Sequence, residues 1–377
     1  MEFSFTDEQR ELRRSVVEFS RASLNADLIE RDREARFPRE LWTLCAKFGV
    51  TGWPLPEAFG GKGMDLVGVF HALEGLGYGC GDNGLVFSLH AHLWGCAMPI
   101  LLFGTDEQKG RYLPGLADGR TVGAIAMAEP EAGSDAFSLS ARAELRGGEY
   151  ILNGMKTLIT NAPVADLFVV FARVEPGGVT AFLVEKNRPG LKPGRTLQKI
   201  GLRSSPLGEV ILEDCRVPEE NRLGQAGGGP VIFTMAMEYE RCGIPASQVG
   251  TMERILERCV QFARKRKQFG KPLGEFQAVS HRIAEMKIRL ESCRGLVYRA
   301  AWLKSRGKQA VLEASMAKAH VSESYVQNCL DAVQILGGAG TLEAHEMERE
   351  LRDAIPSRIY SGTVDIQKNI ISKWMGL

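Results

Sequence analysis

The chain contains 377 residues, of which 44% are hydrophobic and 25% are charged, and its formal net charge is +1 at pH 7. This composition is typical of a globular protein with two or three domains, and the near-neutral charge argues against a nucleic-acid partner. We expect no run long enough to span a membrane, and the start MEFSFTDEQREL lacks the basic-then-apolar layout of a signal peptide. The sequence therefore predicts a cytoplasmic protein.

The cysteines and histidines indicate neither a disulfide framework nor a metal site. The eight cysteines lie singly, without a CxxC pair, and are expected to be small core residues. The closest two histidines, His90 and His92, are spaced wrongly for one face of a helix. No nucleophile elbow, P-loop or dinucleotide fingerprint follows a predicted strand. The chemistry must therefore come from another kind of site.

Residues 1–121 are predicted to form an N-terminal helical domain. Thr6 followed by Gln9 has the form of a capping box, and apolar residues then recur at helical spacing. Residues 52–64, GWPLPEAFGGKGM, are dense in Gly and Pro and are expected to be a loop between helices. Helical patterns resume beyond this loop.

Residues 122–226 are predicted to form a central β domain, because the hydrophobic period changes there. The stretch ARAELRGGEYILNGMKTLIT alternates polar and apolar residues around Gly147 and Gly148, which indicates a hairpin. DLFVVFARV, TAFLVEK and GEVILEDCRVP are short, β-branched and separated by turn residues, as in a small sandwich or barrel.

Residues 227–377 are predicted to form a second helical domain, which begins within the glycine-rich stretch GQAGGGP. The order helical, β, helical excludes a doubly wound α/β protein, in which strands and helices alternate. The fold class is therefore mainly α with a central β domain.

Two glutamates in MAMEYERC, residues 235–242, have different surroundings on a helix. Glu238 lies three residues before Arg241 and is expected to form a surface ion pair with it. Glu240 has only small or apolar helix neighbours at the corresponding spacings. A carboxylate on such a strip is costly to bury. Either the strip is a solvent edge, or it lines a pocket that requires a base.

Four stretches together resemble the acyl-CoA dehydrogenase family, in the same order and over essentially the whole chain. They are AMAEPEAGSD (126–135), RKQFGKPLGEFQ (266–277), QILGGAG followed by RDA (334–340 and 352–354), and IYSGTVDIQ (359–367). The resemblance implies a helical domain, a β domain and a C-terminal four-helix bundle, assembled as a homotetramer that binds FAD between the β domain and the bundle.

The resemblance also implies the residues that bind FAD. Backbone groups at Met127 and Ala128, with Thr160, would contact the flavin ring and tune it. The pyrophosphate and adenine end would be reached from a neighbouring subunit, since arginine and glycine-rich backbone suit a diphosphate. The residues implied for that end, and for the remaining flavin contacts, are Arg266, Phe269, Gln277, Gln334, Gly337, Gly338, Thr363 and Asp365. Taken alone, the run around Arg266 would be a solvated face and GGAG a helix-ending turn.

The catalytic base is expected at an unusual position. Many family members have a carboxylate one residue after the Tyr of IYSGT, where this chain has Ser361. A smaller branch, which includes isovaleryl-type and long-chain-type enzymes, places its glutamate on a bundle helix just before an arginine. That position matches Glu240. An apolar site would raise the pKa of its carboxyl towards the working pH, as a general base requires.

The implied reaction is the formation of an α,β double bond in an acyl thioester. Glu240 would remove the α-proton while a hydride passes from the β-carbon to flavin N5. The residues implied to contact the substrate are Ser134, Glu238, Arg241, Ser361 and Gly362, and Ser134 also lies in the stretch that contacts the cofactor. The thioester carrier is CoA or an acyl- or peptidyl-carrier protein, and an electron-transfer flavoprotein is the expected acceptor.

Two alternatives remain open from the sequence. Ala128 stands where many members have a hydroxyl residue, and Leu158 where many have a tryptophan against the flavin. These departures permit a flavin oxidase or monooxygenase on the same fold. Ser361 permits a flavin-binding protein without turnover, although Glu240 argues against it.

Overall fold

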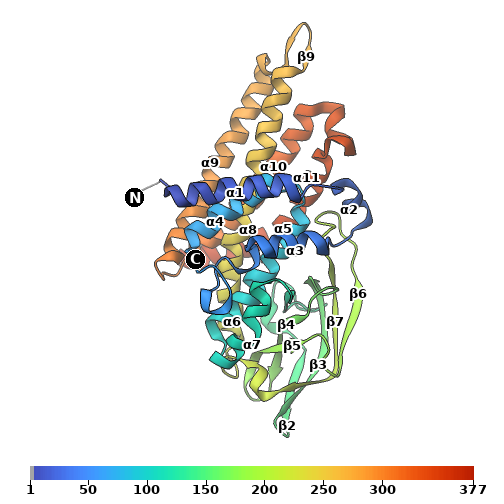
Figure 1. Cartoon of the computed structure of the whole chain (residues 1–377), viewed down its shortest axis with the longest axis vertical. Coiled ribbons are helices and arrows are strands. Elements are labelled where there is room, and N and C mark those ends of the chain that lie inside the picture. The colour runs from blue at the N-terminus through green and yellow to red at the C-terminus, as the bar shows by residue number, and fades with distance from the viewer. Residues whose placement is uncertain (1–3) are drawn as a thin grey trace.

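The computed structural model describes residues 4–377, and Figure 1 shows helices above and around a β domain that lies at the lower end of the molecule. The predicted capping box is confirmed, because the Thr6 side chain accepts a hydrogen bond from the backbone of Gln9 and the Gln9 side chain accepts one from the backbone of Thr6. The N-terminal helices are α1 (Asp7–Ser23), α2 (Leu28–Glu34), α3 (Arg39–Phe48), α4 (Leu66–Gly79), α5 (Asn83–His92), α6 (Met98–Phe103) and α7 (Asp106–Ala117).

The expectation that no run reaches the length of a membrane span is wrong. Helix α5, the π-helical turn Leu93–Ala97 and α6 form one helical stretch, Asn83–Phe103, with a mean hydropathy of 1.6 over its most apolar 18 residues. Of that window, 83% is buried inside the protein. Packing in the core therefore accounts for these apolar side chains. A helix that is buried in a folded domain needs apolar residues on all sides, just as a helix in a bilayer does.

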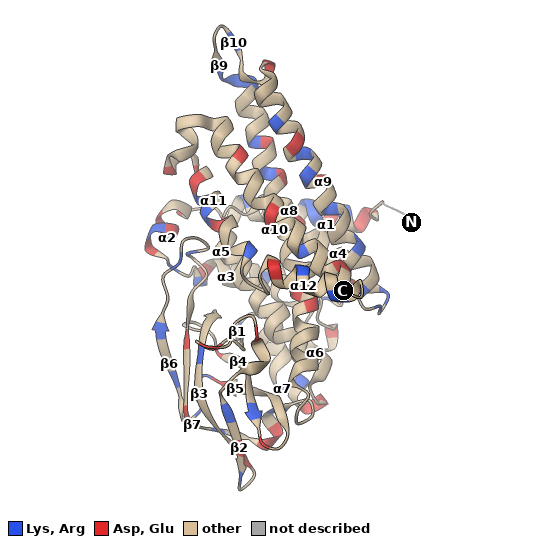
Figure 2. Cartoon of the chain, turned by 180° about the vertical axis from the view of Figure 1, so that it is seen from behind, with Lys and Arg blue, Asp and Glu red and all other residues tan. Residues whose placement is uncertain are grey.

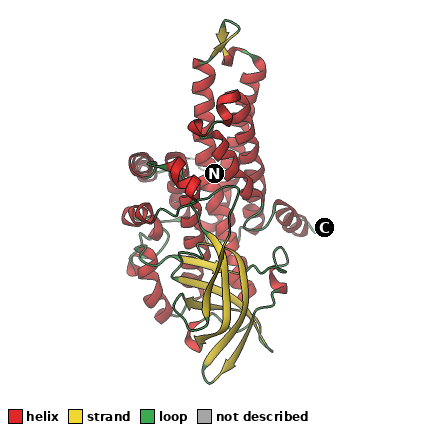
Figure 3. Ribbon diagram, turned by 90° about the vertical axis from the view of Figure 1, so that its right-hand side faces the viewer, coloured by secondary structure: helices red, strands yellow, loops and turns green. Residues whose placement is uncertain are grey.

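The β domain contains the strands that follow α7, drawn in Figure 3 as a curved set of arrows below the helices. They are β1 (Gly123–Ala126), β2 (Arg142–Arg146), β3 (Glu149–Thr160), β4 (Leu167–Val174), β5 (Gly178–Glu185), β6 (Leu191–Thr196), β7 (Leu207–Pro218) and β8 (Arg222–Leu223). The order is β6-β7-β3-β2-β4-β5-β8, and β1 pairs in parallel with β4. The predicted hairpin is present, with Arg146 opposite Glu149 across Gly147 and Gly148.

The C-terminal helices are α8 (Gly229–Lys265), α9 (Gln277–Ser305), α10 (Val311–Leu336), α11 (Met347–Ala354) and α12 (Val364–Trp374). The short strands β9 (Lys267–Gln268) and β10 (Lys271–Pro272) close the α8–α9 hairpin. This tip projects from the upper end of the molecule, and Figure 2 shows basic residues gathered at it.

Helix α8 connects the β domain to the bundle. Near its start, Phe233 packs edge-on against Phe137 and Phe171 of the β domain. Further along, a Cβ on Gly243 would lie 2.4 Å from Nε1 of Trp94, so α8 and the apolar N-terminal stretch are in close contact there. Glu240 lies on α8 between these two contacts, at the junction of the helical and β regions.

Candidate active site

Glu240 is buried on α8, with 8% of its surface exposed. This burial excludes the solvent-edge alternative for its small and apolar strip. Burial raises the pKa of the Glu240 carboxyl, while the hydrogen bond from Ser361 opposes that shift. A carboxyl whose pKa is raised towards neutrality has the basicity required to take a proton from carbon at the working pH.

Ser361 orients the carboxylate from the loop before α12. Its hydroxyl donates a hydrogen bond to Oε1 of Glu240. The backbone of Ser361 is left-handed, with φ of 57°, and its carbonyl oxygen accepts from Nε of Arg241 at 2.9 Å and Nε2 of Gln367 at 3.1 Å. These two donors hold a strained backbone, so the hydroxyl remains directed at the base.

Gly362 is required by the same loop. Its φ is 86°, a conformation that favours glycine, and its carbonyl accepts from Nε2 of Gln367 at 3.0 Å. A Cβ at this position would lie 2.7 Å from Nε2 of Gln367 and 3.4 Å from Nη2 of Arg241. Any side chain there would therefore displace the groups that support Ser361.

The predicted surface ion pair between Glu238 and Arg241 is wrong. Glu238 is buried, and its Oε1 accepts from the backbone N–H of Ala310 at 2.6 Å and lies 3.2 Å from Nζ of Lys304. The carboxylate thus fixes the segment before α10. Arg241 instead donates to the Ser361 carbonyl, because α8 faces other helices here and not solvent. The expected contact of Glu238 with substrate stays a prediction.

A second positive charge, besides that of Arg241, acts on Glu240. Lys318 on α10 is 2% exposed, and its charge, with that of Arg241, lowers the pKa of Glu240. The residues three and four positions from Glu240 on α8 carry no cation, as the sequence indicates, but Lys318 on α10 supplies a positive charge from across the bundle. The sequence pattern around Glu240 could not predict this interaction, because Lys318 is 78 positions away along the chain.

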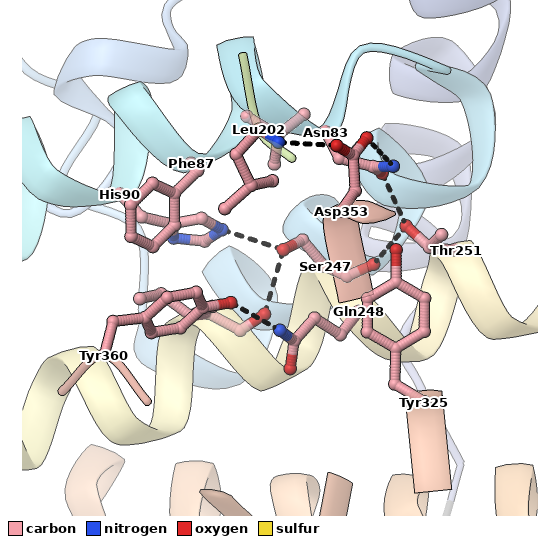
Figure 4. Close-up of a pocket in the computed structure, with 12 residues that line it drawn as sticks. Asn83, Phe87, His90, Leu202, Ser247, Gln248, Thr251, Tyr325, Asp353 and Tyr360 are labelled. Atoms are coloured by element: carbon pink, nitrogen blue, oxygen red, sulfur yellow. Dashed lines mark hydrogen bonds between the residues drawn. The ribbon is translucent and has the colours of Figure 1, made fainter. Parts of the chain in front are cut away.

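A small hollow lies near Glu240, and part of it is open to solvent. Figure 4 shows its lining, in which Gln248 donates to the Tyr360 hydroxyl at 2.7 Å and His90 is bonded to Ser247 at 2.9 Å. Ile244, one helical turn after Glu240, and Tyr360, the residue before Ser361, line it as well. The hollow therefore has apolar and hydrogen-bonding walls, which include residues that neighbour Glu240 on α8 and Ser361 in the loop.

The ring-binding positions expected in the β domain lie together at one end of β3. Backbone N–H of Thr157 donates to the Ala128 carbonyl at 2.9 Å, and Nζ of Lys156 lies 3.2 Å from the Met127 carbonyl. Thr160 is half-buried at the end of the same strand. Leu158 is left-handed, with φ of 56°, and 61% exposed, which is unusual for a large apolar side chain in a strand. An apolar surface is thus presented next to the predicted ring contacts.

The remaining candidates for substrate and flavin contacts, Ser134, Thr363 and Asp365, lie in two separate segments of the chain. Ser134 is exposed in the loop between β1 and β2. The Thr363 hydroxyl caps α12 by accepting from the Ile366 N–H at 3.2 Å, and Asp365 is exposed in the first turn of that helix. Their predicted contacts with substrate and flavin are not decided by these positions.

The candidates for the adenine end lie far from the β domain of the same chain. Phe269 is 93% exposed at the β9–β10 tip, at the end of the molecule opposite the β domain (Figure 1). The other exposed members of this group, at the same tip or at the end of α10, are Arg266, Gln277, Gln334, Gly337 and Gly338. One chain therefore does not complete the predicted cofactor site, and a second copy must supply this group if the assignment holds.

Sequence reasoning did not identify three residues that build the site: Gln367, Tyr360 and Lys318. Tyr360 and Gln367 both belong to the IYSGTVDIQ stretch that contains Ser361. Their polar side chains within this stretch were the available signal. For Lys318 the only signal was a lysine within the apolar and small-residue face of a predicted helix.

The sequence matches three family models, described as the N-terminal, middle and C-terminal domains of acyl-CoA dehydrogenase. They cover residues 6–120, 124–215 and 227–376. Together these matches account for nearly the whole chain, in the helical, β and helical order that the structure shows.

Individual proteins are similar over the full length. An L-prolyl-(peptidyl-carrier protein) dehydrogenase of Pseudomonas fluorescens is 42% identical over 100% of both chains. The crystal structure of the prolyl acyl carrier protein oxidase AnaB is 47% identical, with a TM-score of 0.98 over 99% of this chain and 100% of that one. A structure of PigA with FAD and proline is 40% identical, with a TM-score of 0.98 over 100% of both. The chain therefore belongs to the acyl-CoA dehydrogenase family.

Proposed function

We propose that this protein is an FAD-dependent acyl-thioester dehydrogenase in which Glu240 is the base. The observation that carries the proposal is the buried Glu240 carboxylate, which the Ser361 hydroxyl orients beside a small hollow. Membership of the acyl-CoA dehydrogenase family supports the reaction class. The position of Glu240 on α8 supports assignment to the branch that the MEYERC stretch indicates, in which the catalytic glutamate lies on a bundle helix.

The chemistry assigned to the protein is the handling of one proton. Glu240 takes H⁺ from the α-carbon, the β-carbon loses a hydride, and the electrons left at the α-carbon form the double bond. FAD supplies the hydride acceptor when it is bound. The Ser361 hydroxyl holds the carboxylate in place before the transfer. Burial of Glu240 limits its contact with water, which strengthens the electrostatic effects that act on its carboxylate.

The residues present fit a flavin. The exposed apolar Leu158 beside Met127 and Ala128 offers a surface for the planar ring, and strand ends supply backbone groups next to it. At the other end, Arg266 lies in the exposed run of basic residues at the hairpin tip, which suits a diphosphate. The 40% identity with PigA, described with FAD and proline, supports the same cofactor for this chain.

A homotetramer and a cytoplasmic location belong to the proposal. The distance between the hairpin tip and the β domain of one chain favours a cofactor site shared between subunits (Figure 1). All eight cysteines are free and buried, which suits a reducing compartment.

The substrate we propose is a prolyl group on a peptidyl-carrier protein. The similarity to prolyl-carrier dehydrogenases over the whole chain supports it. The hollow is small and is lined in part by polar side chains. Hydrogen-bonding side chains such as Gln248 and Tyr360 in its wall suit a polar ring better than a plain alkyl chain.

The direct test compares thioesters under anaerobic conditions. Purified protein is mixed with prolyl-carrier protein, prolyl-CoA and butyryl-CoA, and bleaching of the flavin absorbance is followed. We expect fast bleaching with the prolyl-carrier thioester. Bleaching by butyryl-CoA at an equal or higher rate would contradict the proposed substrate, and bleaching by none of them would favour a flavin-binding protein without turnover.

An oxidase is the second candidate, because the similar protein AnaB is named an oxidase and Ala128 and Leu158 alter the ring's expected surroundings. Reoxidation of the reduced flavin decides between them. Rapid reoxidation by air with release of hydrogen peroxide would support the oxidase. Slow reoxidation by air, with rapid reoxidation by an electron-transfer flavoprotein, would support the dehydrogenase.

A further inference from the structure

We propose that Lys318 is a positioning residue for the base, whose buried ammonium keeps the Glu240 carboxylate ionised until it takes the substrate's proton. This inference rests on the proposed function, since it concerns the same base. Lys318 touches neither the hollow nor the expected ring contacts, so its effect acts through Glu240.

The first observation is that Lys318 is buried without a partner. It is 2% exposed, and among residues 4–377 its Nζ makes no hydrogen bond. Other buried lysines behave differently: Lys156 lies 2.7 Å from Glu129, and Lys304 lies 3.2 Å from Glu238. A buried charge without a partner is costly for folding, and titratable groups with perturbed surroundings cluster at functional sites.

The second observation is the place of Lys318 in the bundle. Ser322, one turn later on α10, donates to the Lys318 carbonyl at 2.7 Å and to the Ser357 carbonyl at 2.8 Å. This turn of α10 is therefore fixed to the segment that leads into Ser361.

The third observation is the set of charges around the two groups. The charges of Arg241 on α8 and of Arg358 in the segment before the loop act against the Lys318 ammonium, whereas the charge of Glu240 favours it. The charge of Glu240 also contributes to the raised pKa of the buried Tyr360 phenol, after burial itself. In the described part of the chain, Arg241 and Lys318 are the two cations whose charges lower the pKa of Glu240.

These two cations have different tasks. The Nε of Arg241 is committed to the Ser361 carbonyl, so its removal would disturb the loop. The Nζ of Lys318 is committed to no described group, so its removal takes away a charge without breaking a hydrogen bond. Lys318 is therefore the position at which electrostatic support of the base is separable from its geometry.

The proton balance follows from this arrangement. Burial and, to a smaller extent, the charge of Arg241 lower the pKa of Lys318 to about 7, although Glu240 opposes the shift. Before reaction the ionised carboxylate and the ammonium stabilise each other. After Glu240 has taken the α-proton it is neutral, and the ammonium loses the partner that favoured its charge. The pair thus favours the charge state in which the base is ready to react.

The test uses two readouts on the holoenzyme. The first is the pH dependence of anaerobic flavin reduction by prolyl-carrier thioester. The second, independent of turnover, is infrared titration of the carboxyl band that Glu240→Gln removes. In Lys318→Met we expect both transitions to move upward by roughly one pH unit, because a nearby opposite charge lowers a carboxyl pKa by about 1–3 units. Reduction would then be about tenfold slower below the transition and unchanged well above it.

Two variants complete the experiment. Lys318→Arg keeps the charge and should keep both transitions within a few tenths of the wild-type pH. Lys368→Met removes one exposed cation from α12 and should leave both unchanged. If Lys318→Met does not fold, Lys318→Arg decides alone, since an upward shift in that variant would overturn the proposal.

The failure of this inference is distinguishable from failure of the proposed function. Unchanged transitions in folded Lys318→Met, while Glu240→Gln abolishes flavin reduction, would overturn the role of Lys318 and leave the base in place. Full flavin reduction in Glu240→Gln would overturn the proposed function itself.

Discussion

The hydroxyl of Ser361 donates a hydrogen bond to the carboxylate of Glu240, although the two residues are 121 positions apart. Ser361 stands where many members of the family carry their base. The serine therefore has a contact of its own at that position, because it orients the buried carboxylate that we propose as the base.

Ser361→Ala should stay active but should need a higher pH. The hydrogen bond from Ser361 lowers the pKa of Glu240 against the effect of burial, so its loss raises that pKa further. The ionised fraction then falls near neutral pH and recovers at higher pH. We expect the acidic limb of the flavin-reduction profile to rise by roughly one pH unit, since a hydrogen bond to a charged group contributes about 1.5–3 kcal/mol at most. A loss of several orders of magnitude at every pH would contradict this role.

The double variant Glu240→Gly with Ser361→Glu should recover part of the activity that Glu240→Gly loses. The two side chains meet within hydrogen-bonding distance, so a carboxylate placed at residue 361 reaches the same space. Recovery is limited by geometry, because a misplacement of about 1 Å can cost roughly a hundredfold. Single-turnover rates of the single and double variants provide the measurement. A double variant no faster than Glu240→Gly would show that the two positions do not serve one α-carbon.

Arg266→Ala should weaken FAD retention if a second subunit completes the cofactor site. Arg264 lies in the same basic run and is also exposed, so Arg264→Ala is the matched control. Flavin-to-protein ratios after gel filtration, together with light scattering, should show a tetramer that loses flavin only in Arg266→Ala. A wild-type monomer with full flavin occupancy would contradict the shared site.

Gly243→Ala should destabilise the protein, because the added Cβ would lie 2.4 Å from Nε1 of Trp94. Overpacking of a core typically costs about 1–3 kcal/mol. Gly295→Ala on α9 is the control, since nothing lies within 4 Å of its added Cβ, and it should stabilise the helix by about 1 kcal/mol. Urea unfolding of both variants tests the contact between α8 and the apolar stretch. Equal effects of the two substitutions would show that this contact is not tight.

The sequence was sufficient where the signal is local. The capping box at Thr6 and the hairpin at Gly147 depend on neighbours within a few positions, and both are present. The raised pKa of Glu240 also agrees with its apolar helix neighbours.

The sequence was insufficient where the partner lies on another element. Glu238 looked like a surface residue because Arg241 is three positions away, yet its partners are Lys304 and the Ala310 N–H across the bundle. Lys318 was not identified for the same reason. Backbone strain at Ser361 could not be read either, because it depends on donors from α8 and α12.

The most direct test of Glu240 as the base is the anaerobic rate of flavin reduction in Glu240→Gln. An amide nitrogen cannot take the α-proton, so the rate should fall by several orders of magnitude while the fold and flavin spectrum persist. Glu257→Gln, the same change at an exposed position of α8, should reduce its flavin at the wild-type rate. Near-normal flavin reduction in Glu240→Gln would contradict the account and place the base elsewhere.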